Sequence, residues 1–296
     1  MNGSSKDIAK LYTVTQSLTD DEAIGLLPVF YANLDPSWIP SLDVLDNITD
    51  PSTRLRCIEN VTKIFSSLCY IVRNPLFPLD ATPDLWPRIW KWMEFLRLYH
   101  ECVPASTASE VVSTHVSQSQ ILLKFGQHPQ TCLAMFSTKG VRRTLATAWA
   151  TLVHRLYTAD EPATLGVIAF PLLALSDMKD PQNLVEVVDG CGGSYKALAL
   201  TLMLNISQAV ANSKSDMAVT SITPVLCFLS DVSRISPEFV AYLLSHGIIS
   251  SLVSALDIDG VPPPAEGVPD RPVEVELCLR SLIRYLNVSP GYPWTV

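Results

Sequence analysis

Residues 54–72, RLRCIENVTKIFSSLCYIV, decide the fold class of this chain. Their apolar side chains recur at steps of three and four, which place them on one face of an α-helix. Asp50 and Pro51, just upstream, supply an N-cap and a first-turn residue whose φ is already set. The pattern therefore predicts an amphipathic helix whose apolar face carries Leu55, Ile58, Val61, Phe65, Leu68 and Val72.

Similar periodic segments recur along the rest of the chain, whereas alternating strand patterns are few. LYTVT (11–15) is the best strand candidate, and it is short. The sequence therefore predicts an all-α protein. Besides 54–72, helices are expected at roughly 20–33, 85–102, 107–124, 141–157, 162–176, 194–211, 217–232, 237–245, 248–256 and 273–286.

Three segments share a spacing of a glycine, a leucine five residues later and a large apolar residue four further on. They are Gly140/Leu145/Trp149, Gly193/Leu198/Leu202 and Gly247/Leu252/Leu256, with glycines 53 and 54 residues apart. Another 53 residues upstream, Pro87 takes the place of the glycine, with Trp92 and Leu96 in the apolar positions. Helices repeated at a fixed interval are typical of stacked layers, in which each unit covers the apolar face of its neighbour. We predict an armadillo/HEAT-like helical-repeat solenoid, although this interval exceeds the usual 40–47 residues of those repeats.

The segment LWPRIWKWMEFL (85–96) holds three of the six tryptophans in the chain. On a helical wheel, Arg88, Lys91, Glu94 and Arg97 form one polar stripe, and apolar groups cover most of the remaining surface. Trp90 and Trp92 point in nearly opposite directions, so the rings do not converge on one ligand. This pattern favours a helix buried between layers over an aromatic binding pocket.

The side of each repeat helix away from its leucine positions is a candidate surface for a partner. Trp90, Arg143 and Lys196 stand three residues after their glycine or proline anchors, on that side. In a solenoid this side can line a groove, and aromatic and arginine side chains are common in protein-binding surfaces. Ordinary helix packing or solvated charge would account for them as well.

The segment LVEVVDGCGGSYKALAL (184–200) carries the strongest indication of an enzyme. It imitates a strand, a glycine-rich turn at 189–194 and a helix, the arrangement that binds nucleotides or S-adenosylmethionine. It lacks the third glycine of GxGxxG, and no acidic residue ending a second strand follows about 20 residues later. A methyltransferase-like enzyme with such a cofactor is therefore the alternative hypothesis, and our first expectation is a non-enzymatic protein without a cofactor.

Composition and motifs disfavour several other classes. A net charge of −8 with no run of four Lys/Arg disfavours nucleic-acid binding and membrane docking. No apolar run reaches the 20 or so residues of a membrane span, and the N-terminus lacks a signal-peptide core. The seven scattered cysteines fit buried free thiols in an intracellular, cytoplasmic or nuclear protein. Asp20, Asp21 and Glu22 fit a helix start better than a metal site, and His100 and Cys102 do not face each other as a catalytic pair.

FYANLDPSWIPSLDVLDNITDPSTRLRCIENV (30–61), LWPRIWKWMEFL (85–96) and VDGCGGSYKALALTL (188–202) resemble the N-terminal helical region of basidiomycete proteins. Many of those proteins carry a MYND-type zinc finger near their C-terminus. The resemblance implies an armadillo-like domain that binds proteins. It implies no metal here, because the paired CxxC ligands of a MYND finger are absent from this chain.

These patterns predict a helical-repeat domain over 1–256 and a Pro/Gly-rich loop over 257–272. Residues 273–296 are predicted to be a terminal helix and tail, which either pack on the same domain or lead to a C-terminal region beyond this chain. The function expected from this organisation is a protein-interaction scaffold or adaptor with a protein or peptide partner. Its identity and oligomeric state do not follow from the sequence.

Overall fold

The computed structural model describes residues 5–41, 50–100, 108–158, 178, 180–211, 224–225, 228–229, 231–232 and 235–256. Within these residues the regular elements are helices and no strand occurs, which confirms the prediction of an all-α protein. The chain divides into two compact units, residues 1–138 and 139–296, and each is described by itself. The single helical-repeat domain over 1–256 stays a prediction, and the predicted loop 257–272 and tail 273–296 lie outside the described residues.

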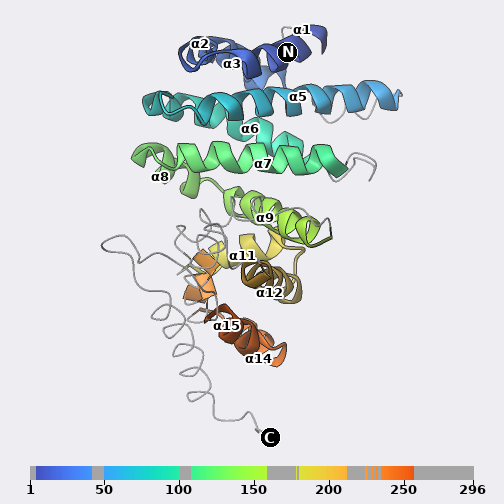
Figure 1. The fold of residues 1–296 in the computed structure, drawn as a ribbon, viewed down its shortest axis with the longest axis vertical. Coiled ribbons are helices and arrows are strands. Elements are labelled where there is room, and N and C mark those ends of the chain that lie inside the picture. The colour runs from blue at the N-terminus through green and yellow to red at the C-terminus, as the bar shows by residue number, and fades with distance from the viewer. Residues whose placement is uncertain are drawn as a thin grey trace, which may run out of the picture. The chain divides into compact units, whose positions relative to one another are not determined.

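The first unit is built of helices that lie in layers. Its elements are α1 (Ser5–Ser17), α2 (Asp20–Gly25), α3 (Leu27–Asn33), the 3₁₀ turn η1 (Pro36–Trp38), α5 (Pro51–Val72), the 3₁₀ turn η2 (Leu79–Ala81), α6 (Thr82–His100), α7 (Ala108–Phe125) and α8 (Pro129–Ser137). The long helix α5 packs against α1 on one side and α7 on the other, and these three form successive layers in Figure 1. The predicted helix over 54–72 is therefore confirmed and begins three residues earlier.

A row of polar side chains joins α5 to α7. The Thr114 hydroxyl donates to the Thr62 hydroxyl over 3.2 Å, 52 residues away in sequence. One turn further along both helices the hydroxyls of Ser66 and Ser117 lie 3.4 Å apart, 51 residues away in sequence. Because both partners advance together, the two helices run parallel and in register. Thr62, Thr114 and Ser117 are buried and Ser66 is half-buried, and pairing lets their hydroxyls leave water at low cost.

Helices α6 and α8 meet in the same way at their N-terminal ends. The hydroxyls of Thr82 and Thr131 lie 2.7 Å apart in a buried contact between residues 49 positions apart. Both side chains are almost completely buried. Thr82 begins α6 and Thr131 lies in the first turn of α8, so these two helices start side by side.

The second unit contains α9 (Val141–Thr158), α11 (Pro181–Gly190), α12 (Tyr195–Ala211), α14 (Pro237–Ser245) and α15 (Ile248–Leu256). The Trp149 indole N–H donates to the Asn205 amide oxygen over 2.8 Å, across 56 residues of sequence. The Gln208 amide donates to the Val153 carbonyl over 2.8 Å, across 55 residues. Helices α9 and α12 therefore also run parallel, because both partners again advance together along their helices.

The three glycines of the predicted repeat share one backbone conformation. Gly140, Gly193 and Gly247 have φ of 91°, 74° and 87°, in the left-handed region that side chains rarely adopt. Each stands within two residues of the start of a helix, namely α9, α12 or α15. The leucines five residues after them are fully buried, as predicted: Leu145, Leu198 and Leu252.

The helices that lead into those glycines also begin alike. Helices α8, α11 and α14 each have a proline directly after the N-cap residue. The N-cap side chain accepts a backbone N–H in each case, from Thr131, Gln182 and Phe239 respectively. This combination satisfies an otherwise unpaired donor and presets the first helical φ. The three helices that precede the repeat glycines therefore start in the same way.

Three details of the predictions are wrong. Pro87 does not precede a helix but lies inside α6. The first copy of the predicted repeat, which includes Trp92 and Leu96, therefore has no residue before its helix that corresponds to the glycines. LYTVT (11–15) belongs to α1, where the Thr13 and Thr15 hydroxyls donate to carbonyls four residues back. The predicted helix over 20–33 is two helices, because Gly25 ends α2 and Pro28 lies in the first turn of α3. The helices predicted at 162–176 and 273–286, and most of 217–232, lie outside the described residues.

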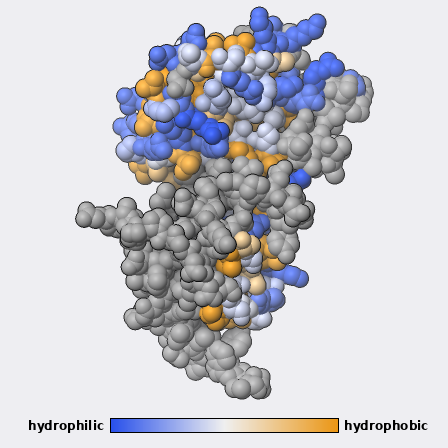
Figure 2. All heavy atoms as spheres, viewed as in Figure 1, coloured by the Kyte–Doolittle hydropathy of each residue, from blue (hydrophilic) through white to orange (hydrophobic). Residues whose placement is uncertain are grey.

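Each unit has its own apolar core. In the first, Phe30, Phe65, Trp92 and Phe125 are almost completely buried, and in the second Trp149 and Phe239 are. The described surface of the first unit mixes hydrophilic and apolar areas on the face shown in Figure 2. Leu133, on α8, is the most exposed of the large apolar side chains described, at 72%.

Candidate functional site

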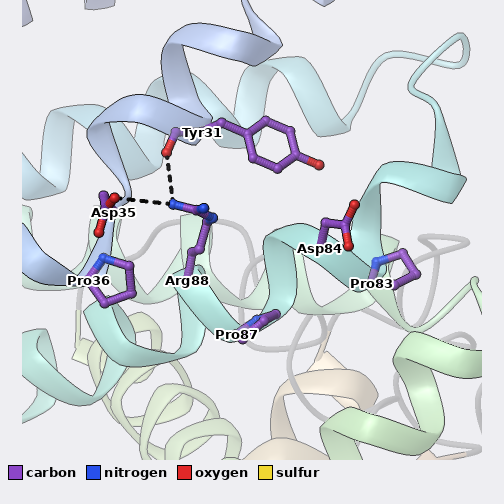
Figure 3. A pocket seen from close by; sticks show the side chains of 7 residues that line it. All are labelled: Tyr31, Asp35, Pro36, Pro83, Asp84, Pro87 and Arg88. Atoms are coloured by element: carbon purple, nitrogen blue, oxygen red, sulfur yellow. Dashed lines mark hydrogen bonds and ion pairs between the residues drawn. The ribbon is translucent and has the colours of Figure 1, made fainter.

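A pocket of about 500 Å³ opens in the first unit between the end of α3 and the first turns of α6. Tyr31 lines one side of the pocket, and Pro36, Pro83 and Pro87 line the opposite side (Figure 3). Two of these prolines stand four residues apart on α6, so they share one helix face. The lining residues are Tyr31, Asp35, Pro36, Pro83, Asp84, Pro87 and Arg88.

Arg88 lies in the middle of the pocket and connects α6 to the end of α3 through the following contacts. Its guanidinium donates to the Tyr31 carbonyl oxygen over 3.3 Å. It also lies 3.7 Å from the Asp35 carboxylate and 5.9 Å from the centre of the Tyr31 ring. Both charged side chains are more than a third exposed, so this ion pair contributes little to stability. Its effect is to orient Arg88 away from the other end of the pocket.

The Tyr31 hydroxyl marks that other end. It donates to the Ala81 carbonyl oxygen over 3.2 Å, which orients the phenol and leaves its oxygen able to accept a hydrogen bond. Figure 3 shows the Asp84 carboxylate on the same side of the pocket as this hydroxyl. Burial raises the pKa of Tyr31, and the negative charge of Asp84 raises it further, while Arg88 acts in the opposite direction. The phenol therefore stays protonated at neutral pH.

Asp35 is held ionised by its own loop. The Ser37 backbone N–H donates to its carboxylate over 2.9 Å. Hydrogen bonds from Ser37, and to a lesser degree the charge of Arg88, lower the pKa of Asp35. The pocket thus carries two carboxylates and one guanidinium at neutral pH, a net charge of −1.

The structure buries Trp90, the aromatic member of the predicted surface. Only 6% of Trp90 is exposed, and its ring stacks on Trp86 with centroids 5.5 Å apart. Trp92 is 1% exposed and meets Phe95 edge-on at 5.6 Å. The wheel argument is confirmed, since the two tryptophans pack on different neighbours within a buried helix. Little of the Trp90 ring is left for a partner.

Arg143 and Lys196 both lie in the second unit, whereas Trp90 lies in the first. Arg143 is half-buried on α9, and its Nε is buried without a hydrogen-bond partner in the described residues. Lys196 is exposed in the first turn of α12. As a surface for a partner, the set Trp90, Arg143 and Lys196 stays a prediction.

The glycine-rich turn after Asp189 is explained by helix packing and turn geometry. The alternative hypothesis requires a strand over 184–189, and this requirement is wrong because these residues lie in α11. A Cβ at Gly190 would meet the Arg143 carbonyl oxygen and would lie 2.6 Å from the Ala146 Cβ, so glycine lets α11 approach α9 closely. Gly192 and Gly193 have positive φ, and the Gly193 N–H donates to the Val188 carbonyl in a helix-ending turn.

The thiols that the structure describes are free, as predicted, and two of the three are also buried as predicted. Cys69 and Cys191 are free and buried, and Cys132 is half-buried. Burial raises the pKa of Cys69 to about 11 and that of Cys191 to about 12. Both therefore stay protonated, and unreactive as nucleophiles, at neutral pH. Cys102, proposed above not to pair with His100, lies outside the described residues.

The acidic cluster at the start of α2 acts as a helix cap. The Glu22 carboxylate accepts the backbone N–H of Thr19 over 3.0 Å and its hydroxyl over 2.8 Å. These hydrogen bonds lower the pKa of Glu22. In the described part of the chain, no group of three or more His, Cys, Asp or Glu side chains is placed to hold a metal ion. Nor does any described helix combine the length and apolar character of a membrane span.

Comparison with known proteins found no relative of this chain. No family model, no curated protein and no solved structure matches the chain. The resemblance to the helical region of the MYND-type proteins therefore stays a prediction.

The pocket around Tyr31 was not predicted from the sequence. Its two sides are 57 residues apart, as the contact of Arg88 with the Tyr31 carbonyl shows. The only local signal was Arg88 itself, which stands on the polar stripe of the tryptophan-rich helix. Nothing in the short-range pattern relates that stripe to Tyr31 or Asp35.

Proposed function

We propose that this chain is a non-enzymatic protein-interaction scaffold or adaptor built on a helical-repeat solenoid. The observation that carries the proposal is the interval between hydrogen-bonded side chains of neighbouring helices. It is 51 and 52 residues between α5 and α7 and 55 and 56 residues between α9 and α12. Parallel helices paired at a nearly constant interval support a repeat, and repeats create the extended surfaces on which such proteins bind partners.

The shared helix starts support the same proposal. A capped proline begins α8, α11 and α14, and a glycine of positive φ precedes α9, α12 and α15. In this proposal α11 and α12 form one layer of the second unit, and α14 and α15 form the next. The predicted resemblance to an armadillo-like, protein-binding region is consistent with it, as is an intracellular location.

Photo-crosslinking at exposed positions tests the proposed function. A photoreactive amino acid replaces Pro87 at the rim of the pocket in one variant and Lys196 on α12 in another. The matched control carries it at Glu59, whose side chain is 41% exposed on α5. Each variant is irradiated in an extract of the cells that naturally make the protein and is then purified under denaturing conditions.

We expect a discrete adduct at Pro87 or Lys196 that excess unmodified protein abolishes and that the Glu59 variant does not form. Competition matters because a specific partner is saturable, whereas random collisions are not. If neither variant forms an adduct that can be competed away, the scaffold proposal is wrong.

A further inference from the structure

The two ends of the pocket around Tyr31 differ in how their charges are satisfied. At one end Arg88 contacts both Asp35 and the Tyr31 carbonyl. At the other end Asp84 is exposed and has no hydrogen-bond or ion-pair partner among the residues that the structure describes. The open acceptor of the pocket is therefore the Asp84 carboxylate, with the Tyr31 hydroxyl oxygen on the same side (Figure 3).

The wall between these two ends is apolar. Pro83 and Pro87 line the pocket from the same face of α6, and Pro87 is exposed. Proline rings offer methylene surface and no N–H donor, so they suit an aliphatic stem rather than a polar one. A volume of about 500 Å³ accommodates a long side chain together with part of its backbone.

The net negative charge of the residues that line the pocket favours a positively charged ligand group. Two carboxylates face one guanidinium among the lining residues. Asp80, fully exposed and 3.7 Å from His128 Nε2, adds a further carboxylate one residue before the Ala81 carbonyl that accepts the Tyr31 hydroxyl hydrogen bond. The position of Asp84 in the first turn of α6 explains an acidic residue there. It does not explain why that residue shares a pocket with a fixed phenol and two prolines.

Resting on the proposed function, we infer that this pocket receives a basic side chain of a partner protein, with arginine preferred to lysine. The cationic head lies between the Asp84 carboxylate and the Tyr31 hydroxyl, and the methylenes of the side chain lie along Pro83 and Pro87. Arginine is preferred because its planar guanidinium can donate to both oxygens at once, whereas the lysine ammonium acts as a compact point charge.

Degenerate peptide mixtures test this inference without knowledge of the partner. The probes are N-acetylated, C-amidated nonapeptides with random flanks and one defined central residue: arginine, lysine, citrulline, leucine or glutamate. Citrulline keeps the shape of arginine and removes its charge. We expect the full chain to retain about three to five times more of the arginine mixture than of the citrulline mixture, the range of a partly exposed ion pair.

Charge variants separate recognition from folding. Asp84→Asn should abolish the preference for arginine over citrulline. Asp84→Lys should turn it into a preference for the glutamate mixture, a change of sign that a folding defect does not produce. Asp21→Asn, an exposed carboxylate in the first turn of α2 and outside the pocket, is the matched control and should keep the preference.

Two unfavourable outcomes have different meanings. Peptide binding without a preference for a basic centre, or with a preference that survives Asp84→Asn, would overturn the inference and leave the proposed function standing. Retention of no mixture above a blank matrix would overturn the inference as well. Together with the absence of any adduct in the crosslinking experiment, it would also remove the proposed function.

Discussion

Replacement of Gly190 by alanine tests the packing account of the glycine-rich turn. The added methyl group would collide with the α9 backbone at the Arg143 carbonyl and lie 2.6 Å from the Ala146 Cβ, so the two helices must separate. Overpacking of this kind costs about 1–3 kcal/mol. Because the obstacle is backbone and cannot move aside easily, we expect a cost near the upper limit of this range. The better helix propensity of alanine offsets up to about 1 kcal/mol of it. We expect a net loss of about 2 kcal/mol in the free energy of unfolding of the second unit.

Two other glycines provide matched comparisons. Gly193→Ala meets no atom within 4 Å but has a φ of +74°, so it should cost about 1 kcal/mol from backbone strain alone. Gly25→Ala, in α2, has neither problem and should be neutral or stabilise the first unit by up to about 1 kcal/mol. Native-state hydrogen exchange with mass spectrometry reads α9 and α11 separately from the first unit.

The relative stability losses of the three variants test whether Gly190 is required for the close approach of α11 to α9. Adding Ala146→Gly to Gly190→Ala should recover part of the loss, because it removes the side chain that the new methyl meets. If Gly190→Ala costs no more than Gly193→Ala, close approach of α11 to α9 is not the reason for this glycine.

Further predictions concern the tryptophans, a buried hydrogen bond and a thiol. Because Trp92 and Trp90 are both buried, replacement of either by alanine should lower the free energy of unfolding by about 3–5 kcal/mol in urea titrations; a much smaller loss for Trp90→Ala would restore it as a surface residue. Asn205→Ala leaves the Trp149 indole N–H buried without its partner and should cost about 1–3 kcal/mol, whereas a neutral result would show that water reaches the indole. Because burial raises the pKa of Cys191 to about 12, its contribution to stability is complete below the ordinary thiol pKa of 9.0 and is lost as the pH rises through about 12. Maleimide labelling followed by mass spectrometry should find this thiol unmodified at pH 8 in the folded protein, and rapid labelling there would contradict its burial.

Local features of the sequence predicted most of the helices. The bounds of α14 and α15 agree with the predicted 237–245 and 248–256, because a capped proline and a glycine frame the first of them. The glycines of the repeat were found for a physical reason, since a φ near +80° leaves few alternatives to glycine. LYTVT was misassigned because alternation over five residues is too short to outweigh the helix around it.

Features that depend on contacts between distant residues were not predictable. Polar residues such as Ser117 and Thr114 suggest an exposed helix face, yet both are buried because hydroxyls on α5 pair with them. The pocket was not predictable for the same reason, since Tyr31 and Arg88 form it only because α3 and α6 are adjacent in the fold. A pattern with a period of three or four residues carries no information on which helix lies opposite.

A disulfide between positions 66 and 117 tests the central claim most directly, namely that helices one repeat apart run parallel and in register. The Ser66 and Ser117 hydroxyls lie 3.4 Å apart, so the chain carrying Ser66→Cys and Ser117→Cys should form this disulfide under mild oxidation. The control pairs Ser66→Cys with Ser113→Cys, one helical turn or about 6 Å away along α7. Peptide mass spectrometry identifies the linked positions and separates them from the nearby Cys69. We predict the 66–117 disulfide in high yield and little of the 66–113 disulfide; failure of the first pair to link, or equal yields from both, would contradict the parallel pairing on which the proposed repeat depends.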